Sequence, residues 1–301
     1  MNKANTPNSF VAKIDLNLAE KMKGDLIDQG FTITVPPYTL FSGKKKGISC
    51  TLYASGKLVV QGKEKNDFIT FYLEPEILKE LSFSYPETLI DTTPRIGIDE
   101  AGKGDFYGPL CIAGVYAGEG GVDQLLKLGV RDSKRMKDQK ILSLAAQIRT
   151  KFPHSIVKLF PKKYNELYEK FRNLNHLLAW GHATAIGELV EGTGCRNVII
   201  DQFASEHVVE NALKRKELDV SLTQRHYGEE DPVVAAASIL ARAAFVEGID
   251  TLSKMIEQEL PKGASAKVTE TGRILVAKHG PDVLEKVAKL HFKTTGVILN
   301  A

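Results

Sequence analysis

Two adjacent carboxylates, Asp99 and Glu100, stand where an apolar run ends and a glycine-rich stretch begins. The apolar run has Ile96 and Ile98 at the period of two that is typical of a strand. Two acids at the end of a buried strand are costly to hold close together unless a cation neutralises them. We expect a divalent metal there, because hard cations such as Mg²⁺ take carboxylate oxygens as ligands.

A simpler interpretation is that Asp99 and Glu100 are ordinary turn residues, which is the more frequent role of such a pair. Adjacent residues on a regular strand also point to opposite faces, so both acids face one site only if the pleat breaks at Glu100. The glycines that follow, Gly102, Gly104 and Gly108, would permit such a break.

A second buried strand ends in the same way, because the apolar residues 198–200 are followed by Asp201. In α/β sheets, functional groups collect at the carboxyl ends of the strands. If the two strands are neighbours, Asp99, Glu100 and Asp201 converge. Two such strand ends are a more specific signal than either one alone.

A fourth acid is available in the run Glu229-Glu230-Asp231, which stands before Pro232 and an Ala-rich helical pattern. Acids followed by a proline fit the first turn of a helix, so capping is one role for this run. The other role gives one of the three acids to the metal site. The residue types and spacing leave both open.

The elements that must position these acids follow from the pattern after Arg95, where strands alternate with helices. This alternation predicts a mixed or parallel sheet covered by helices over residues 95–301. We expect further strands at 110–117 and 156–160. We expect helices at 137–151, 164–189 and 233–246.

Residues 1–80 predict a separate small α+β unit, with a helix at 16–29 and short strands separated by turn signals. A linker is expected at 81–94, which contains Pro86 and Pro94. Lys44, Lys45 and Lys46 fall in a predicted hairpin loop. They are either a solvated turn or part of a basic face that follows a phosphate backbone.

Composition limits the other possibilities. The chain has 301 residues, 43% of them hydrophobic and 26% charged, and a net charge of +3 that is compatible with nucleic acid. Its three cysteines lie far apart, with no Cys-x-x-Cys, which disfavours a disulfide framework or a zinc site. The first residues are polar and no apolar run reaches the roughly 18 residues of a membrane span, so we expect a cytoplasmic location.

Several motifs together resemble one family. The stretch Gly97–Leu110 resembles the opening motif of type 2 ribonucleases H, and so do Asp132-Ser133-Lys134, the strand that ends at Asp201, and the segments 235–239 and 260–265. Lys103 between two glycines, the region 175–180 and the ending Lys289-Leu290-His291-Phe292-Lys293 are similar to ribonuclease HIII. The N-terminal unit resembles the TATA-box-binding-protein-like substrate-binding domain of that subfamily.

The resemblance implies an RNase H-like α/β fold and a metal-dependent endonuclease that hydrolyses the RNA strand of RNA–DNA hybrids. It implies Mg²⁺ or Mn²⁺. Phosphodiester hydrolysis by metal-activated water suits two such ions, and we expect it to leave 5′-phosphate and 3′-hydroxyl ends. The metal-binding and catalytic acids of the family fall on Asp99, Glu100 and Asp201. We place the fourth on Glu229, with Glu230 second, because the loop length here departs from the family pattern.

By the same resemblance, backbone groups of Gly102, Lys103 and Gly104 would contact the ribose 2′-hydroxyl, and Lys44, Lys45 and Lys46 would bind substrate. We expect a monomer that needs no protein or membrane partner. Three alternatives remain: an enzyme of the ribonuclease HII type that cuts at single embedded ribonucleotides, a non-catalytic hybrid-binding protein, and a carboxylate-metal phosphatase.

Overall fold

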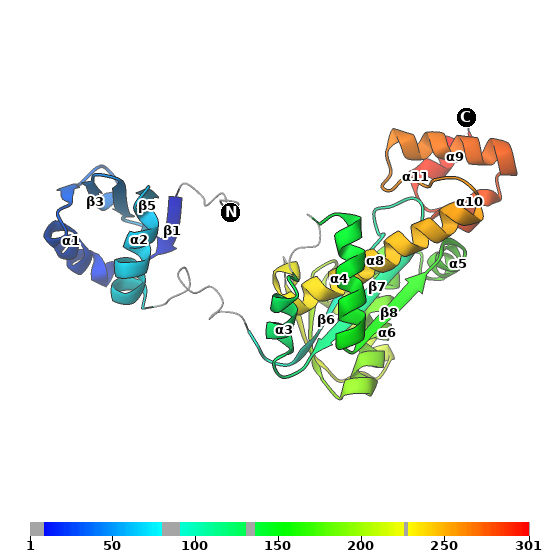
Figure 1. Ribbon diagram of the computed structural model, residues 1–301, viewed down its shortest axis with the longest axis horizontal. Coiled ribbons are helices and arrows are strands. Elements are labelled where there is room, and N and C mark those ends of the chain that lie inside the picture. The colour runs from blue at the N-terminus through cyan, green and yellow to red at the C-terminus, as the bar shows by residue number, and fades with distance from the viewer. Residues whose placement is uncertain (1–8, 80–90, 131–135, 226–227, 301) are drawn as a thin grey trace. The chain divides into compact units, whose positions relative to one another are not determined.

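The computed structural model describes residues 9–79, 91–130, 136–225 and 228–300, without the side chains of Glu206 and Glu229. The chain divides into two compact units, Met1–Asp91 and Thr92–Ala301, whose elements are labelled in Figure 1. Most of the predicted linker, and the motif Asp132-Ser133-Lys134, lie outside the described residues. Each unit is considered separately below.

The N-terminal unit is an antiparallel sheet with a helix packed on it. Its elements are β1 (Ser9–Lys13), a short 3₁₀ turn (Leu16–Leu18), α1 (Ala19–Asp28), β2 (Thr32–Thr34), β3 (Thr39–Lys45), β4 (Ile48–Tyr53), β5 (Lys57–Gly62), α2 (Lys65–Phe68) and a π-helical segment (Ile69–Leu78). The strand order is β1-β5-β4-β3-β2. Met22 and Leu26 of α1 are fully buried in the core that this sheet covers. The predicted helix and short strands are therefore present, and β2 to β5 form an antiparallel meander.

The C-terminal unit is a five-stranded sheet between two layers of helices. Its elements are β6 (Arg95–Ala101), β7 (Leu110–Ala117), α3 (Gly121–Lys127), α4 (Asp138–Lys151), β8 (His154–Leu159), α5 (Pro161–Phe171), α6 (Leu174–Thr193), β9 (Asn197–Asp201), α7 (Glu206–Arg215), β10 (Ser221–Arg225), a 3₁₀ turn (Gly228–Glu230), α8 (Pro232–Met255), α9 (Ala266–His279), α10 (Val283–Val287) and α11 (Lys293–Leu299).

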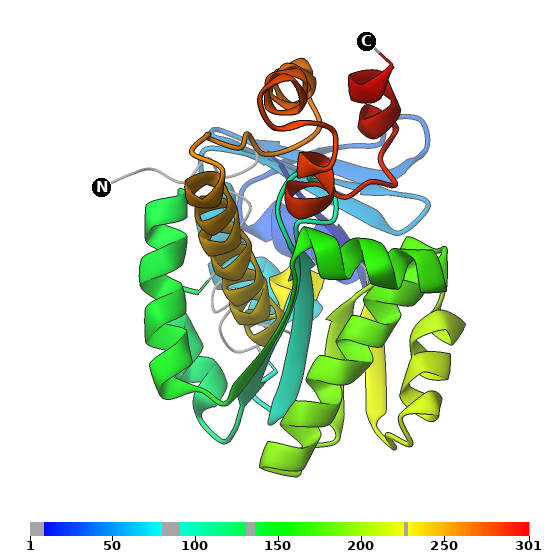
Figure 2. The same ribbon diagram turned by 90° about the vertical axis from the view of Figure 1, so that its right-hand side faces the viewer.

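The sheet has the order β10-β9-β6-β7-β8. Strand β9 is parallel to β6 and to β10, whereas β7 is antiparallel to both β6 and β8, so the predicted mixed sheet is confirmed. Helices α4 and α8 cover one face and α6 and α7 the other (Figure 2). The β6 side chains Ile96 and Ile98 pack in the core on the α6 face.

The long helix predicted at 164–189 is wrong in one respect, because two helices occupy this stretch. Arg172 ends α5 in the left-handed conformation, and Asn173 is extended. The Asn173 side chain then accepts hydrogen bonds from the backbone N–H groups of Asn175 and His176, at 2.8 and 3.4 Å. Asn173 is therefore the N-cap of α6. The apolar spacing in the sequence continues across residues 172–173, but the helical backbone is interrupted there.

Helix α8 passes so close to the sheet that β6 needs a glycine. A Cβ at Gly97 would lie 2.5 Å from backbone atoms of Val233 and Val234. Of the described helices, α8 alone is long and apolar enough to cross a membrane, and 78% of that apolar window is buried inside the protein. Helix α8 is therefore a core helix, and it extends nine residues beyond the predicted end at 246.

Candidate active site

Asp99 and Asp201 lie side by side at the carboxyl ends of two parallel strands. Strands β6 and β9 pair with Ile98 opposite Ile200. The next residue on each strand is the acid, and paired residues of neighbouring strands point to the same face, with the strands about 4.8 Å apart. The two strands are thus neighbours, which is the condition under which we expected Asp99 and Asp201 to lie close together.

Asp99 is a strongly perturbed acid. Its Oδ1 accepts a hydrogen bond of 2.8 Å from the backbone N–H of Glu100, and Ser238 of α8 bonds to its side chain. Burial raises the pKa of Asp99 most, the charges of Glu100 and Asp201 raise it further, and it reaches about 7. Asp99 is therefore a buried carboxyl whose neutral form is favoured first by loss of solvation and then by two neighbouring carboxylates.

Glu100 leaves the strand on the other face. Its Oε2 lies 3.1 Å from Nε2 of His182 on α6, and its Oε1 lies 3.6 Å from Nζ of Lys103. Burial favours the neutral acid, but the hydrogen bond and charge of His182, together with Lys103, outweigh burial and lower the pKa of Glu100. This carboxylate is therefore held in its charged form.

The pleat break that one shared face would require does not occur. Strand β6 pairs regularly with β7 as far as Ala101, which lies opposite Cys111. Asp99 consequently faces α8, and Glu100 faces α6. The two acids share the end of the strand rather than one of its faces.

An aromatic ring links the groups around Glu100. The ring of Phe203 lies 4.5 Å from the ring of His182, and Lys103 Nζ lies 5.6 Å from the centre of the same ring. His182 is fully buried. Neither His182 nor Phe203 was predicted from the sequence to take part in the site.

The 3₁₀ turn Gly228–Glu230 packs directly on Asp201. The N–H of Gly228 donates to Oδ1 of Asp201 at 2.9 Å. A Cβ at position 228 would lie 2.7 Å from the Asp201 Cα, so only glycine allows this approach. The side chain of Glu229, our predicted fourth acid, lies outside the described residues, and Glu230 is exposed.

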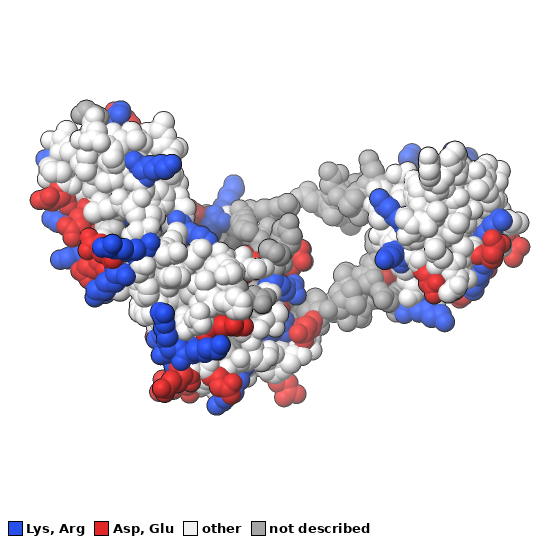
Figure 3. All heavy atoms as spheres, turned by 180° about the vertical axis from the view of Figure 1, so that it is seen from behind, with Lys and Arg blue, Asp and Glu red and all other residues white. Residues whose placement is uncertain are grey.

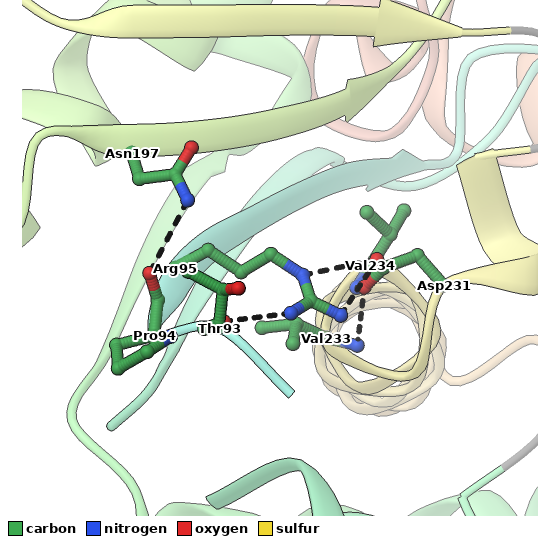
Figure 4. A network of polar contacts seen from close by, with 7 residues as sticks. All are labelled: Thr93, Pro94, Arg95, Asn197, Asp231, Val233 and Val234. Atoms are coloured by element: carbon green, nitrogen blue, oxygen red, sulfur yellow. Dashed lines mark hydrogen bonds and ion pairs between the residues drawn. The ribbon is translucent and has the colours of Figure 1, made fainter. Parts of the chain in front are cut away.

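Asp231, by contrast, has a structural role. Its Oδ2 accepts from Nε of Arg95 at 3.0 Å and lies 2.8 Å from Nη2 (Figure 4). Its Oδ1 accepts from the N–H groups of Val233 and Val234, at 2.8 and 3.4 Å, and so caps α8. Both members of this ion pair are buried. For Asp231, the capping role is the correct one.

The glycine-rich loop has a backbone that only glycine can adopt at its start. Gly102 has φ +86°, and a Cβ there would lie 2.2 Å from the carbonyl oxygen of Pro109, whereas Gly104 faces open space. Further along, Oδ1 of Asp105 accepts from the N–H of Gly263 at 2.6 Å. The loop is therefore held to the turn between α8 and α9, a relationship that the sequence did not indicate.

The lysines predicted to bind substrate lie at the β3–β4 hairpin. The predicted loop is shorter than expected, because Lys44 and Lys45 pair with β4 as the end of β3 and only Lys46 is in the turn. Lys44, Lys45 and Lys46 are all exposed. Lys45 Nζ also donates to the carbonyl of Gln29 at 2.9 Å. On the face that Figure 3 shows, Lys and Arg lie interspersed with Asp and Glu over both units.

A metal site is not fully assembled by the described side chains. Among the residues with described side chains, no three His, Cys, Asp or Glu lie close enough to hold one ion. The donor chemistry nevertheless suits a hard divalent cation, because Asp99 and Asp201 present carboxylate oxygens at one edge and a cation would offset the charge that raises the pKa of Asp99.

Comparison with known proteins gives matches over both units of the chain. The family model for Ribonuclease HII matches residues 96–295, and a domain of unknown function (DUF3378) matches residues 9–83. Ribonuclease HIII of Protochlamydia amoebophila (strain UWE25) is 58% identical over 290 residues, which are 96% of each chain. Ribonuclease HIII of Chlamydia felis (strain Fe/C-56) is 49% identical over 295 residues, 97% of this chain and 98% of the relative.

Solved structures show the same fold. Bst-RNase HIII in complex with Mn²⁺ aligns with a TM-score of 0.69 and 27% identity, covering 97% of this chain and 98% of that one. RNase H3 of Aquifex aeolicus aligns with a TM-score of 0.57 and 27% identity, covering 94% of this chain and 100% of the other.

Proposed function

The chain belongs to the ribonuclease HII family, and on that premise we propose that it is an endoribonuclease of the ribonuclease HIII type, which cleaves the RNA strand of RNA–DNA hybrids. The two relatives named above carry the name Ribonuclease HIII and align over nearly their whole length. The hydrolysis leaves 5′-phosphate and 3′-hydroxyl ends.

The adjacency of Asp99 and Asp201 at the carboxyl ends of two neighbouring strands supports this activity most directly. Carboxylates on neighbouring strand ends, next to a glycine-rich loop, are what metal-dependent hydrolysis of a phosphodiester beside a ribose requires. The cofactor is Mg²⁺ or Mn²⁺, and a related structure, Bst-RNase HIII, contains Mn²⁺. When bound, such ions activate water and stabilise the leaving oxygen.

We assign Asp99, Glu100 and Asp201 as the residues that hold the ions. Asp99 and Asp201 supply oxygens from the α8 side of the strand ends, and Glu100 supplies its carboxylate from the α6 side. His182 and Lys103 keep Glu100 charged, which a metal ligand must be. The backbone of Gly102, Lys103 and Gly104 lies immediately beyond, and we assign it to the ribose 2′-hydroxyl.

The fourth acid must come from a segment beside Asp201. Glu229 remains our first choice, because Gly228 bonds to Asp201, and Glu230 is second. Glu206, the first residue of α7, lies on the other segment that adjoins Asp201 and enters the same comparison. Single Glu→Gln changes at the three positions separate them: the ligand variant should lose metal-dependent cleavage, and the other two should keep it.

The N-terminal unit offers binding groups rather than chemistry. We propose that Lys44, Lys45 and Lys46 contact the phosphate backbone of the hybrid, since all three are exposed at the β3–β4 hairpin. We further propose that the protein acts as a cytoplasmic monomer that needs no protein partner.

Cleavage of end-labelled duplexes by the full-length protein tests the proposed function. A continuous RNA strand paired with DNA should be cut at internal positions with Mg²⁺ or Mn²⁺ and left intact with EDTA. Asp99→Asn should abolish cutting and leave hybrid binding unchanged. Cutting confined to a duplex with a single embedded ribonucleotide would favour the ribonuclease HII type, and binding without cutting would leave a hybrid-binding protein.

A further inference from the structure

A buried lysine near the C-terminal end of the sequence, Lys289, forms hydrogen bonds with the glycine-rich loop. Lys289 is fully buried. Its Nζ donates to the carbonyl oxygens of Asp105 and Gly108 at 2.8 Å each, and to that of Tyr107 at 3.4 Å. A buried amine is costly unless its N–H groups are bonded, so these three acceptors account for its presence there.

The surroundings of Lys289 are mostly apolar or aromatic. Its Nζ lies 5.7 Å from the centre of the Tyr164 ring. Burial lowers the pKa of Lys289 to about 7, although the charges of Asp105 and Cys111 oppose that change. The protein therefore buries this side chain at a large desolvation cost. Such a cost is typical of a group retained for a specific contact.

The main chain strengthens the same contact. The N–H of Lys289 donates to the carbonyl of Phe106 at 2.9 Å, and the N–H of Gly108 donates to the carbonyl of Val287 at 3.0 Å. Tyr107 and Ala288 form an antiparallel bridge. Residues 105–108 and 287–289 are therefore joined as a short two-stranded ribbon, with the Lys289 amine closing one end.

This ribbon begins one residue after Gly104. Its other neighbour along the chain is Pro109, whose carbonyl oxygen closely approaches Gly102 and makes any Cβ there impossible. The backbone of residues 102–104 thus lies between Pro109 on one side and residues 105–108, which are hydrogen-bonded to Lys289, on the other. A shift of the carbonyl groups that accept hydrogen bonds from Lys289 would therefore also move the backbone of residues 102–104.

We propose that Lys289 is a positioning residue for the ribose-contacting loop, acting through the carbonyls of Asp105, Tyr107 and Gly108. The inference rests on the proposed function, in which the backbone of 102–104 contacts the 2′-hydroxyl. The C-terminal segment then serves the reaction although it carries no reacting group. A small displacement at the loop lowers turnover, because catalysis depends on the exact placement of the ribose beside the acids.

Steady-state cleavage by the full-length protein tests this role. Lys289→Met keeps an unbranched side chain that is one atom shorter and removes the amine donors, so kcat should fall at least about tenfold. KM should stay within about threefold, because charges elsewhere carry the affinity for the hybrid. Lys289→Gln keeps two N–H donors and should fall between Lys289→Met and the wild type.

Two controls separate positioning from general destabilisation. Lys286→Met removes an exposed lysine on α10, three residues before Lys289, and should match the wild type. Leu275→Ala removes packing from the core of the C-terminal helices and should lower the melting temperature with kcat within about twofold of wild type. Unchanged kcat in folded Lys289→Met, or an equal kcat loss in Leu275→Ala, would overturn the inference.

The two proposals fail in different ways. A wild type that does not cleave hybrids removes the proposed function, whereas an active wild type with a fully active Lys289→Met removes only this inference. If neither Lys289 variant folds, hydrogen exchange on the wild type decides. The backbone amides of residues 106–108 and of residues 287–289 should then exchange at similar rates. Much faster exchange of the amides of 106–108 would overturn the inference.

Discussion

His182 Nε2 lies 3.1 Å from Oε2 of Glu100, and the two side chains come from a helix and a strand that are 82 positions apart in the chain. The histidine is fully buried and its ring packs on Phe203. It fixes the orientation of Glu100 and keeps that carboxylate charged. Groups that orient a ligand in this way are usually needed for full activity.

Replacing His182 should therefore impair cleavage. His182→Leu leaves Glu100 with Lys103 as its remaining cationic partner, so we expect a fall of about 10–100-fold in kcat/KM. His182→Gln keeps an N–H donor and should lose less. The measurement is cleavage of a labelled hybrid with Mg²⁺, below the melting temperature of each variant. Full activity in His182→Leu would remove the positioning role.

Gly228→Ala should disturb the site through its backbone. The new Cβ would lie 2.7 Å from the Asp201 Cα, so one of the two segments must move. We expect a loss of about 1–3 kcal/mol in the free energy of unfolding, together with lower activity. Gly192→Ala on α6 is the control, because nothing lies within 4 Å of the added Cβ. It should be neutral or slightly stabilising in urea unfolding.

Removing one member of the buried Arg95–Asp231 pair should destabilise the protein strongly. Asp231→Ala leaves a buried guanidinium without its carboxylate and uncaps α8, so we expect a loss of about 3–5 kcal/mol in the free energy of unfolding. A double-mutant cycle with Arg95→Met in urea isolates the pair. Losses that simply add would show that the two side chains act independently. The exposed pair Arg196–Asp219, as a control, should contribute less than about 1 kcal/mol.

Lys289 should give the stability of the protein a defined pH dependence. Its pKa is about 7 when folded and takes the ordinary value of 10.5 when unfolded. Between these values the unfolded state binds more protons, so this residue makes the free energy of unfolding rise with pH, by at most about 1.4 kcal/mol per unit. That contribution is complete above the unfolded value and is lost as pH falls towards 7.

The comparison of wild type with Lys289→Met isolates this slope, because all other titrating groups are shared. Urea unfolding at pH 7, 8 and 9 should show the wild-type curve rising relative to that of the variant. Parallel curves would mean that Lys289 keeps an ordinary pKa in the folded protein.

The lysine turn should govern part of the salt dependence of binding. Replacing Lys44, Lys45 and Lys46 by alanine should weaken hybrid affinity. The slope of log K against log salt should fall by about one for each phosphate that the variant no longer neutralises. Fluorescence anisotropy at several salt concentrations with EDTA measures both quantities. Affinity equal to that of wild type at every salt concentration would assign these residues to a solvated turn. Lys254→Ala, on α8, is the matched control.

The sequence by itself determined the local features of this protein. Alternating apolar residues predicted the strands that end at Asp99 and Asp201, because the side chains of a strand alternate between its faces. Acids beside a proline marked the start of α8. The change of pattern at Arg95 marked the beginning of the α/β sheet. Such signals lie within a few residues of one another and need no knowledge of distant parts of the chain.

Only the tertiary structure decided which groups meet. The register of β6 with β9 sets Asp99 beside Asp201, and the unbroken pleat turns Glu100 to α6, where His182 meets it. Asp231 pairs with Arg95 and is therefore not a candidate metal ligand. Lys289 donates a hydrogen bond to the carbonyl of Asp105, 184 residues away in the chain. Contacts over such separations depend on how the sheet and helices pack, because no local spacing relates the residues that they join.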